Sequence, residues 1–129
     1  MFKSTQTLYD DLAKTLGVAS LPADDDGSVE LSIGDDTPVI LFAEDAYTLM
    51  LVAPIVPLPA EPDYGIMLWL MRRNFHDSPL APFRVACDAA GMVVIWGRVP
   101  IGSLDGRSLA ALIDALGQES RLIRDELVG

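Results

Sequence analysis

Residues 28–53, SVELSIGDDTPVILFAEDAYTLMLVA, predict three consecutive β-strands. Residues 28–34 alternate between apolar and polar side chains, which is the pattern of a strand with one solvated face. Residues 38–44 and 47–53 are apolar on both faces, as in strands that are covered on both sides. Residues 34–36, Gly-Asp-Asp, are typical of a hairpin turn, so the three strands should form an antiparallel meander.

A helix is predicted before these strands. Leucines recur every four positions within residues 4–16, which places them on one face of a helix. Ser4 or Thr5 can cap the first free backbone N–H groups. Gly17 follows the last of these leucines, at a position where a left-handed residue commonly ends a helix.

A second helix is predicted after a proline-rich segment. Residues 55–62, IVPLPAEP, contain three prolines and cannot donate a full ladder of hydrogen bonds. We therefore expect a crossing linker there. The second helix should begin at Asp63 or Tyr64 and run to about Phe75.

Two strands, residues 82–88 and 92–98, and a long amphipathic helix over residues 103–128 complete the chain. Runs of strands interrupted by helices, without regular strand–helix alternation, indicate an α+β fold. We expect an antiparallel sheet of about five strands with three helices, in the order α-β-β-β-α-β-β-α. A length of 129 residues fits one domain, residues 1–129.

The charge of the chain restricts its partners. Nine basic and 19 acidic residues give a net charge of −10, which repels phosphate backbones and acidic lipid surfaces. We therefore expect no nucleic-acid partner, whereas basic or amphipathic segments of other proteins would be attracted. No apolar run approaches the ~20 residues that span a bilayer, so we expect no membrane insertion.

The N-terminus and the cysteine content favour the cytoplasm. Residues 1–12, MFKSTQTLYDDL, lack the apolar core of a secretory signal. Cys87 is the only cysteine, which excludes an internal disulfide and a cysteine cluster for zinc.

Few residues could carry catalysis. His76 is the only histidine and follows the second helix, whereas Cys87 lies late in a strand, where a small core residue is expected. No Gly-rich phosphate loop, HExxH motif or GxSxG motif is present. Among the carboxylates, only Glu30 and Asp88 could point from a sheet face, and nothing in the sequence pairs them. We expect no enzyme and no cofactor.

The acidic segment at residues 24–27, Asp-Asp-Asp-Gly, invites comparison with a calcium loop. With Gly27 at the sixth position of such a loop, Ile33 stands at the twelfth, where a bidentate glutamate is required. We therefore expect an acidic turn and no metal site.

The second helix predicts a subunit interface. Residues 66–71, IMLWLM, are apolar on every side of the helix, and such a helix must be covered all round. One face can lie on the sheet, and a second subunit would cover the other, most simply in a two-fold homodimer. A helix at the centre of a monomer is the alternative.

From about Leu8 to Leu127 the chain resembles the class I type III secretion chaperones, the family of the Tir chaperone. The order of its segments carries the resemblance, together with size and acidity. These segments are a leading helix ending at Leu16-Gly17, the turn and strand DDDGSVELSI, apolar strands closing with Pro57-Leu58-Pro59, an apolar helix ending at Arg73-Asn74, the hairpin FRVACDAAGMVVIWGRVP, and a terminal helix opening at Ser103-Leu104-Asp105.

The resemblance implies a homodimer in the bacterial cytoplasm that binds the N-terminal chaperone-binding segment of a secreted effector. The segment would be kept extended and soluble until secretion, without use of ATP. By position in the family, the dimer interface would include Ile66, Trp69, Leu70, Arg73, Phe83 and Val85. The effector-binding residues would be Leu8, Leu12, Phe42, Met50, Val52, Val94 and Trp96.

Two other functions remain open from the residues alone. A small-ligand-binding or enzymatic α+β domain would need a closed pocket, with Tyr47 or Tyr64 as a polar group. A dimeric adaptor could share the fold without a secretion client.

Overall fold

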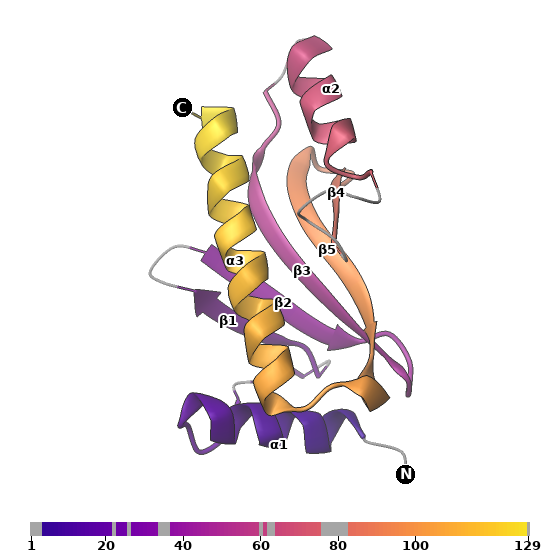
Figure 1. The fold of residues 1–129 in the computed structure, drawn as a ribbon, viewed down its shortest axis with the longest axis vertical. Helices are drawn as coiled ribbons and strands as arrows, with labels where there is room; N and C mark the ends of the chain where they lie inside the picture. The colour runs from indigo at the N-terminus through magenta and orange to yellow at the C-terminus, as the bar shows by residue number, and fades with distance from the viewer. Residues whose placement is uncertain are drawn as a thin grey trace.

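The computed structural model describes residues 4–21, 23–25, 27–33, 37–59, 61, 64–75 and 83–128. They form an antiparallel five-stranded sheet with three helices, so the predicted α+β fold and element order are confirmed (Figure 1). The sheet order is β1-β2-β3-β5-β4. The elements are α1 (Thr5–Leu16), β1 (Val29–Ile33), β2 (Thr37–Ala43), β3 (Thr48–Pro57), α2 (Tyr64–Arg72), β4 (Arg84–Cys87), β5 (Met92–Pro100), a 3₁₀ turn (Ile101–Ser103) and α3 (Gly106–Val128).

The first three strands form the predicted meander. β1 pairs with β2, with Val29 opposite Leu41, and β2 pairs with β3, with Leu41 opposite Leu51. The turn predicted at residues 34–36 lies outside the described residues. Between β2 and β3 the carboxylate of Asp45 accepts a hydrogen bond of 2.8 Å from the backbone N–H of Tyr47, which closes a tight connection.

The linker predicted at residues 55–62 is wrong in its first part. β3 continues to Pro57 and pairs with β5, with a register shift between Pro54 and Val56. Beyond Val52 the strand has no pairing with β2, so one of its sides is an edge. Prolines are tolerated at edges and bulges because their missing N–H groups need no ladder partner there.

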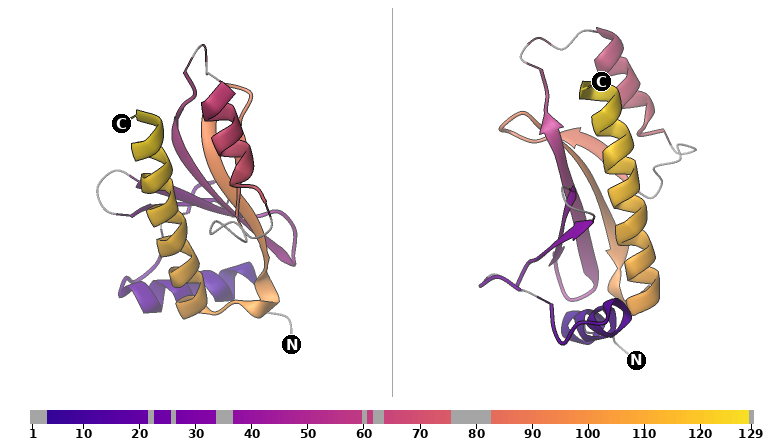
Figure 2. Two further views of the ribbon diagram at one scale, coloured as in Figure 1. Left: turned by 45° about the horizontal axis from the view of Figure 1, so that its top comes forward. Right: turned by 90° about the vertical axis from the view of Figure 1, so that its left-hand side faces the viewer.

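The helices divide the sheet into a covered face and an open face. α3 packs along β1, β2 and β3, and α1 crosses the N-terminal end of α3. In the right-hand view of Figure 2, α2 and α3 lie on one side of the sheet, and no described helix lies over the other side. The buried strand side chains, at alternate positions, point toward the helices. They include Val29, Val39, Leu41, Leu49, Leu51, Val85, Val93 and Ile95.

α1 has the predicted ends. The Ser4 hydroxyl accepts a hydrogen bond of 3.0 Å from the Thr7 N–H, and Gly17 closes the helix with φ of 76°. The crossing with α3 is tight, because a Cβ atom at Gly106 would overlap the backbone carbonyl of Asp11. Only glycine fits at this contact.

α2 and α3 are shorter than expected at one end each. α2 ends at Arg72 rather than at about Phe75. α3 begins at Gly106 rather than near Ser103, because residues 101–103 form the 3₁₀ turn and Asp105 caps α3, its Oδ1 accepting a 2.8 Å hydrogen bond from the Ser108 N–H.

The two C-terminal strands differ from the expected bounds in opposite directions. β4 is confined to Arg84–Cys87, and β5 continues beyond Arg98 to Pro100 because its last residues pair with the start of β3.

None of the helices in the described part of the chain has the length and apolar character that crossing a membrane requires.

Candidate functional site

Five of the seven predicted effector-binding residues lie together on the open face of the sheet. Phe42 stands opposite Met50 in the pairing of β2 with β3, and Val52 stands opposite Trp96 in the pairing of β3 with β5. Val94 lies two positions before Trp96 on β5 and therefore shares its face. We call these five residues the open-face patch.

Ile40 lies beside the patch and is a further apolar residue that was not among the predicted effector-binding residues. Ile40 stands opposite Val52 and is partly exposed. The signal was present in the sequence, because Ile40 and Phe42 are two positions apart and must share a face of β2.

The residues of the patch are only partly exposed. Phe42, Val52, Val94 and Trp96 are half-buried, while Met50 is only 9% exposed. No described helix lies over this face of the sheet.

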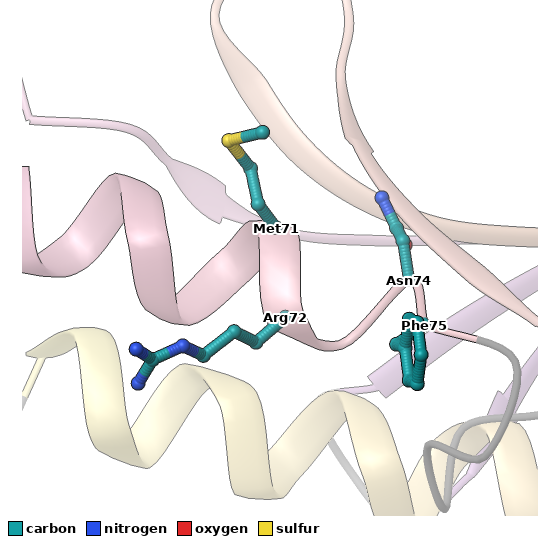
Figure 3. A pocket seen from close by; sticks show the side chains of 4 residues that line it. All are labelled: Met71, Arg72, Asn74 and Phe75. Carbon is teal, nitrogen blue, oxygen red and sulfur yellow. The ribbon is translucent and has the colours of Figure 1, made fainter.

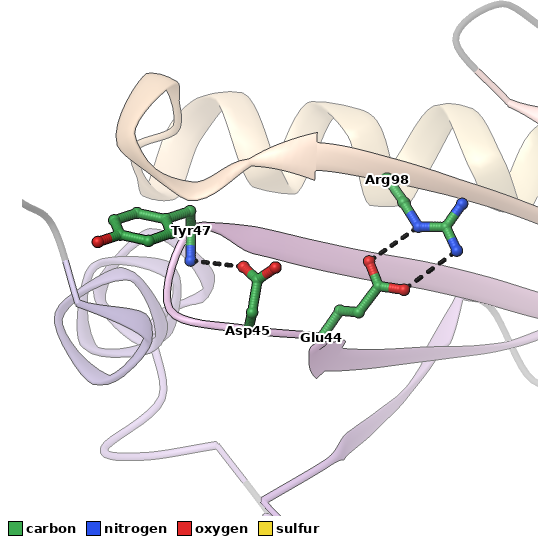
Figure 4. Close-up of polar contacts among 4 residues, drawn as sticks. All are labelled: Glu44, Asp45, Tyr47 and Arg98. Carbon is green, nitrogen blue, oxygen red and sulfur yellow. Dashed lines mark hydrogen bonds and ion pairs between the residues drawn. The ribbon is translucent and has the colours of Figure 1, made fainter.

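An ion pair crosses β3 beside Met50. The Arg98 guanidinium, opposite Met50 on β5, donates hydrogen bonds of 2.8 and 3.0 Å to the carboxylate of Glu44 at the end of β2 (Figure 4). The same guanidinium lies 5.0 Å from the centre of the Trp96 ring. The hydrogen bond and the charge of Glu44 raise the pKa of Arg98 above its ordinary value. The pair thus forms a polar border at one end of the patch.

The other two predicted effector-binding residues lie inside the protein. Leu8 and Leu12 are 0% exposed and belong to the hydrophobic core. In this conformation a partner cannot reach them, because their side chains are already packed within the protomer.

The six residues predicted at the dimer interface fall into two groups. Leu70, Phe83 and Val85 are buried within the protomer. The other three, Ile66, Trp69 and Arg73, are half-buried. The guanidinium of Arg73 stacks on the Trp69 ring, with its carbon 4.0 Å from the ring centre. Ile66, Trp69 and Leu70 form the side of α2 that packs against the protomer's own core, to which Phe83 and Val85 also belong.

The outward side of α2 carries large apolar residues that the sequence analysis did not assign to the interface. Tyr64, Met67, Met71 and Phe75 are 80%, 39%, 68% and 58% exposed. We call these four residues the outer α2 stripe. At its C-terminal end a hollow of about 510 Å³ is lined by Met71, Arg72, Asn74 and Phe75, shown in Figure 3.

A second apolar hollow lies beside the edge strand β1. Its volume is about 220 Å³, and it is lined by Leu16, Leu31, Ser32, Ala110, Ile113 and Asp114. β1 pairs with β2 on one side, and among the described residues the other side carries a single bridge, from Ala23 to Val29.

The residues considered for chemistry do not meet in the described structure. Glu30 is exposed on the open face, and Asp88 lies in a turn, where its carboxylate accepts hydrogen bonds from the Ala90 and Met92 N–H groups, both 2.9 Å. Cys87 is exposed rather than in the core. His76 lies outside the described residues.

In the described part of the chain, the alternative polar groups and the acidic turn also form no site. Tyr47 and Tyr64 are exposed on the surface and do not line a closed pocket. Within the described residues, no three His, Cys, Asp or Glu side chains are close enough to hold a metal ion. Asp26 of the acidic turn lies outside the described residues.

Solved structures share this fold over nearly the whole chain. A chain of the heterodimeric ExoU–SpcU complex from the type III secretion system of Pseudomonas aeruginosa is 25% identical, with a TM-score of 0.77 over 93% of this chain and 97% of that one. A chain of the HopA1–SchA chaperone–effector complex is 20% identical, with a TM-score of 0.74 over 93% of this chain and 92% of that one. The structure of the Yersinia pestis type III secretion chaperone SycH with a fragment of YscM2 contains a chain that is 21% identical, with a TM-score of 0.76 over 92% of this chain and 99% of that one.

No curated protein sequence matches the chain significantly. The model of one protein family matches residues 7–124, which is most of the sequence. On this match, the chain belongs to the Tir chaperone protein (CesT) family.

Proposed function

We propose that the protein is a type III secretion chaperone that binds the N-terminal segment of an effector and keeps it extended and soluble, without catalysis and without ATP. The observation that carries the proposal is the open-face patch, an apolar sheet surface with no described helix over it, in a member of a chaperone family. The related complexes named above pair a chaperone with an effector or a fragment of another protein.

The open-face patch suits a segment that has no fold of its own. An extended chain can lay apolar side chains along Phe42, Val52 and Trp96, which neighbouring strands hold side by side. Part of the interaction free energy is consumed in ordering such a segment, so binding requires several apolar anchors. A row of half-buried side chains across three strands can supply them.

The edge of β1 offers a second contact for the same segment. A strand added beside β1 would use its outward backbone groups, and an apolar side chain could enter the 220 Å³ hollow. Asp114 on the wall of that hollow, together with the net charge of −10, favours a segment that carries basic residues.

The outer α2 stripe supports the homodimer. Tyr64, Met67 and Met71 on one side of the nine-residue helix, with Phe75 just beyond its end, leave an apolar surface that a second subunit can cover. The interface would therefore use this stripe, while Ile66, Trp69, Leu70, Arg73, Phe83 and Val85 hold α2 against its own protomer. We place the dimer in the bacterial cytoplasm, where effectors are made.

Capture of the client from the source bacterium tests the proposal. The tagged protein should retain a protein exported by the type III system, and truncation of that partner should map the contact to its N-terminal segment. Phe42→Asp should lose the partner, whereas Leu122→Asp, at an exposed position of α3, should retain it. Retention of non-secreted proteins alone, or of the same partner by both variants, would refute the proposed site.

A further inference from the structure

The side chain of Asn74 binds the backbone of β4 as a neighbouring strand would. Its Nδ2 donates a hydrogen bond of 3.0 Å to the carbonyl of Val85, and its Oδ1 accepts one of 2.7 Å from the Val85 N–H. Both backbone groups of one residue are thereby satisfied by one carboxamide. Asn74 is also the only asparagine in the chain.

These two backbone groups point away from the sheet. Among the described residues, β4 is an edge strand whose one strand partner is β5. Backbone groups of an antiparallel strand alternate between its two sides, and the Asp88 N–H bonds inward to the Met92 carbonyl at 2.9 Å. Val85 and Cys87 therefore direct their N–H and C=O groups outward, where a further strand would pair.

We infer that Asn74 closes the β4 edge against strand addition, above all by the β4 edge of a second copy of this chain. An unpaired edge is a template for another strand, and proteins block such edges with specific side chains. β4 has four residues, so the carboxamide occupies one of its two outward-facing positions.

A second copy is the relevant partner because the apolar surface that would attract it lies at the same place. Met67 and Met71 of the outer α2 stripe line a 140 Å³ pocket together with Asn74 and Cys87. A subunit that docks on the stripe therefore arrives beside the β4 edge. With the edge closed, contact is limited to the helices, and the two sheets do not join.

The closure also separates the two ends of the sheet. At β1 the described residues leave most of the outer edge without strand partners, whereas at β4 the carboxamide stands in the way. If the protein binds an extended client segment, as proposed above, this difference directs the segment to the β1 edge and away from the β4 edge.

The test needs only the purified protein, so its outcome is independent of any client. Asn74→Ala should remain folded by circular dichroism, and in sedimentation velocity its dimer should persist to lower protein concentrations than the wild-type dimer, because pairing of the two β4 edges would add to the contact at the stripe. Hydrogen exchange of the Val85 amide should accelerate by about tenfold or more, because that N–H loses its acceptor.

A second-site change separates edge closure from simple attachment of α2 to β4. The Cys87 N–H faces away from β5, so Cys87→Pro removes no ladder bond but blocks an added strand. The double variant should dissociate over the same concentration range as the wild type, and so should Cys87→Pro alone. An attachment role predicts that Asn74→Ala does not strengthen the dimer, and that proline reverses nothing.

If Asn74→Ala does not fold, Asn74→Asp tests the closure of the β4 edge instead. Aspartate keeps the acceptor for the Val85 N–H but cannot donate to the Val85 carbonyl, so it should associate more than the wild type. A folded variant, with alanine or aspartate, that matches the wild type in size at every concentration would overturn the inference.

Discussion

Arg98 and Glu44 are joined across β3 by two hydrogen bonds, 54 residues apart in sequence. Their side chains are 52% and 39% exposed, so the pair is screened by solvent and adds little to stability. Its position beside Met50 suggests a different role, as a cover for one end of the open-face patch.

Breaking this pair should open the patch. Glu44→Gln should leave the thermal midpoint nearly unchanged and increase the binding of an apolar dye such as bis-ANS, since Arg98 is then no longer held across β3. Glu30→Gln, at an exposed glutamate on the same face, is the matched control. Equal dye binding by the two variants would show that the pair does not cover the patch.

The Tyr9 hydroxyl is buried, and within the described residues it has no hydrogen-bond partner. An unsatisfied buried hydroxyl costs free energy. Tyr9→Phe should therefore leave the free energy of unfolding unchanged or raise it by up to about 1 kcal/mol. Urea titration measures this, with the exposed Tyr64→Phe as control. A clear loss of stability in Tyr9→Phe would mean that the hydroxyl is bonded.

The same residue predicts a pH dependence. Burial raises the pKa of Tyr9 above its ordinary value of 10.0. The unfolded chain therefore releases this proton first as pH rises past about 10, and the stability that Tyr9 contributes falls in that range. Tyr9→Phe should lose less stability than the wild type between neutral pH and pH above 10.

Gly106→Ala should weaken the contact between α1 and α3. The added methyl group overlaps the Asp11 carbonyl, and overpacking of this kind costs about 1–3 kcal/mol. Gly102→Ala is the control, because nothing lies within 4 Å of a Cβ atom at that position. Equal melting temperatures for the two variants would contradict the observed crossing.

The dimer can be tested on the outer α2 stripe. Met71→Asp places a charge on a side chain that is exposed in the protomer and would be desolvated by a second subunit. Light scattering should then report a folded monomer, while Val18→Asp, near the end of α1, stays dimeric. A wild type that is monomeric at micromolar concentration would contradict the dimer.

Periodicity in the sequence was sufficient to predict most of the fold. The alternation at residues 28–34 and the two apolar strands predicted the meander. The residues of the open-face patch were implied by the resemblance to the chaperone family, and the strand register puts them on one face because strand residues two apart share a face. The prolines after Ala53 were misread, since the sequence does not reveal that β3 becomes an edge there.

Long-range contacts account for the remaining differences. The leucine spacing of α1 predicted an apolar face but not that other elements cover Leu8 and Leu12 completely. An apolar α2 predicted two covered sides, yet which residues face inward depends on how the helix meets β4. The bond from Asn74 to Val85 spans 11 residues and has no sequence pattern.

Binding of a client segment to the open-face patch can be measured by comparing affinities. The N-terminal segment of the captured effector would be titrated calorimetrically into the wild type, Trp96→Glu and Leu122→Glu. Loss of a central apolar anchor typically costs about 2 kcal/mol or more, so Trp96→Glu should bind roughly 30-fold more weakly or not at all. Leu122→Glu should bind like the wild type. Equal affinity of all three folded proteins would show that the client does not bind the open-face patch.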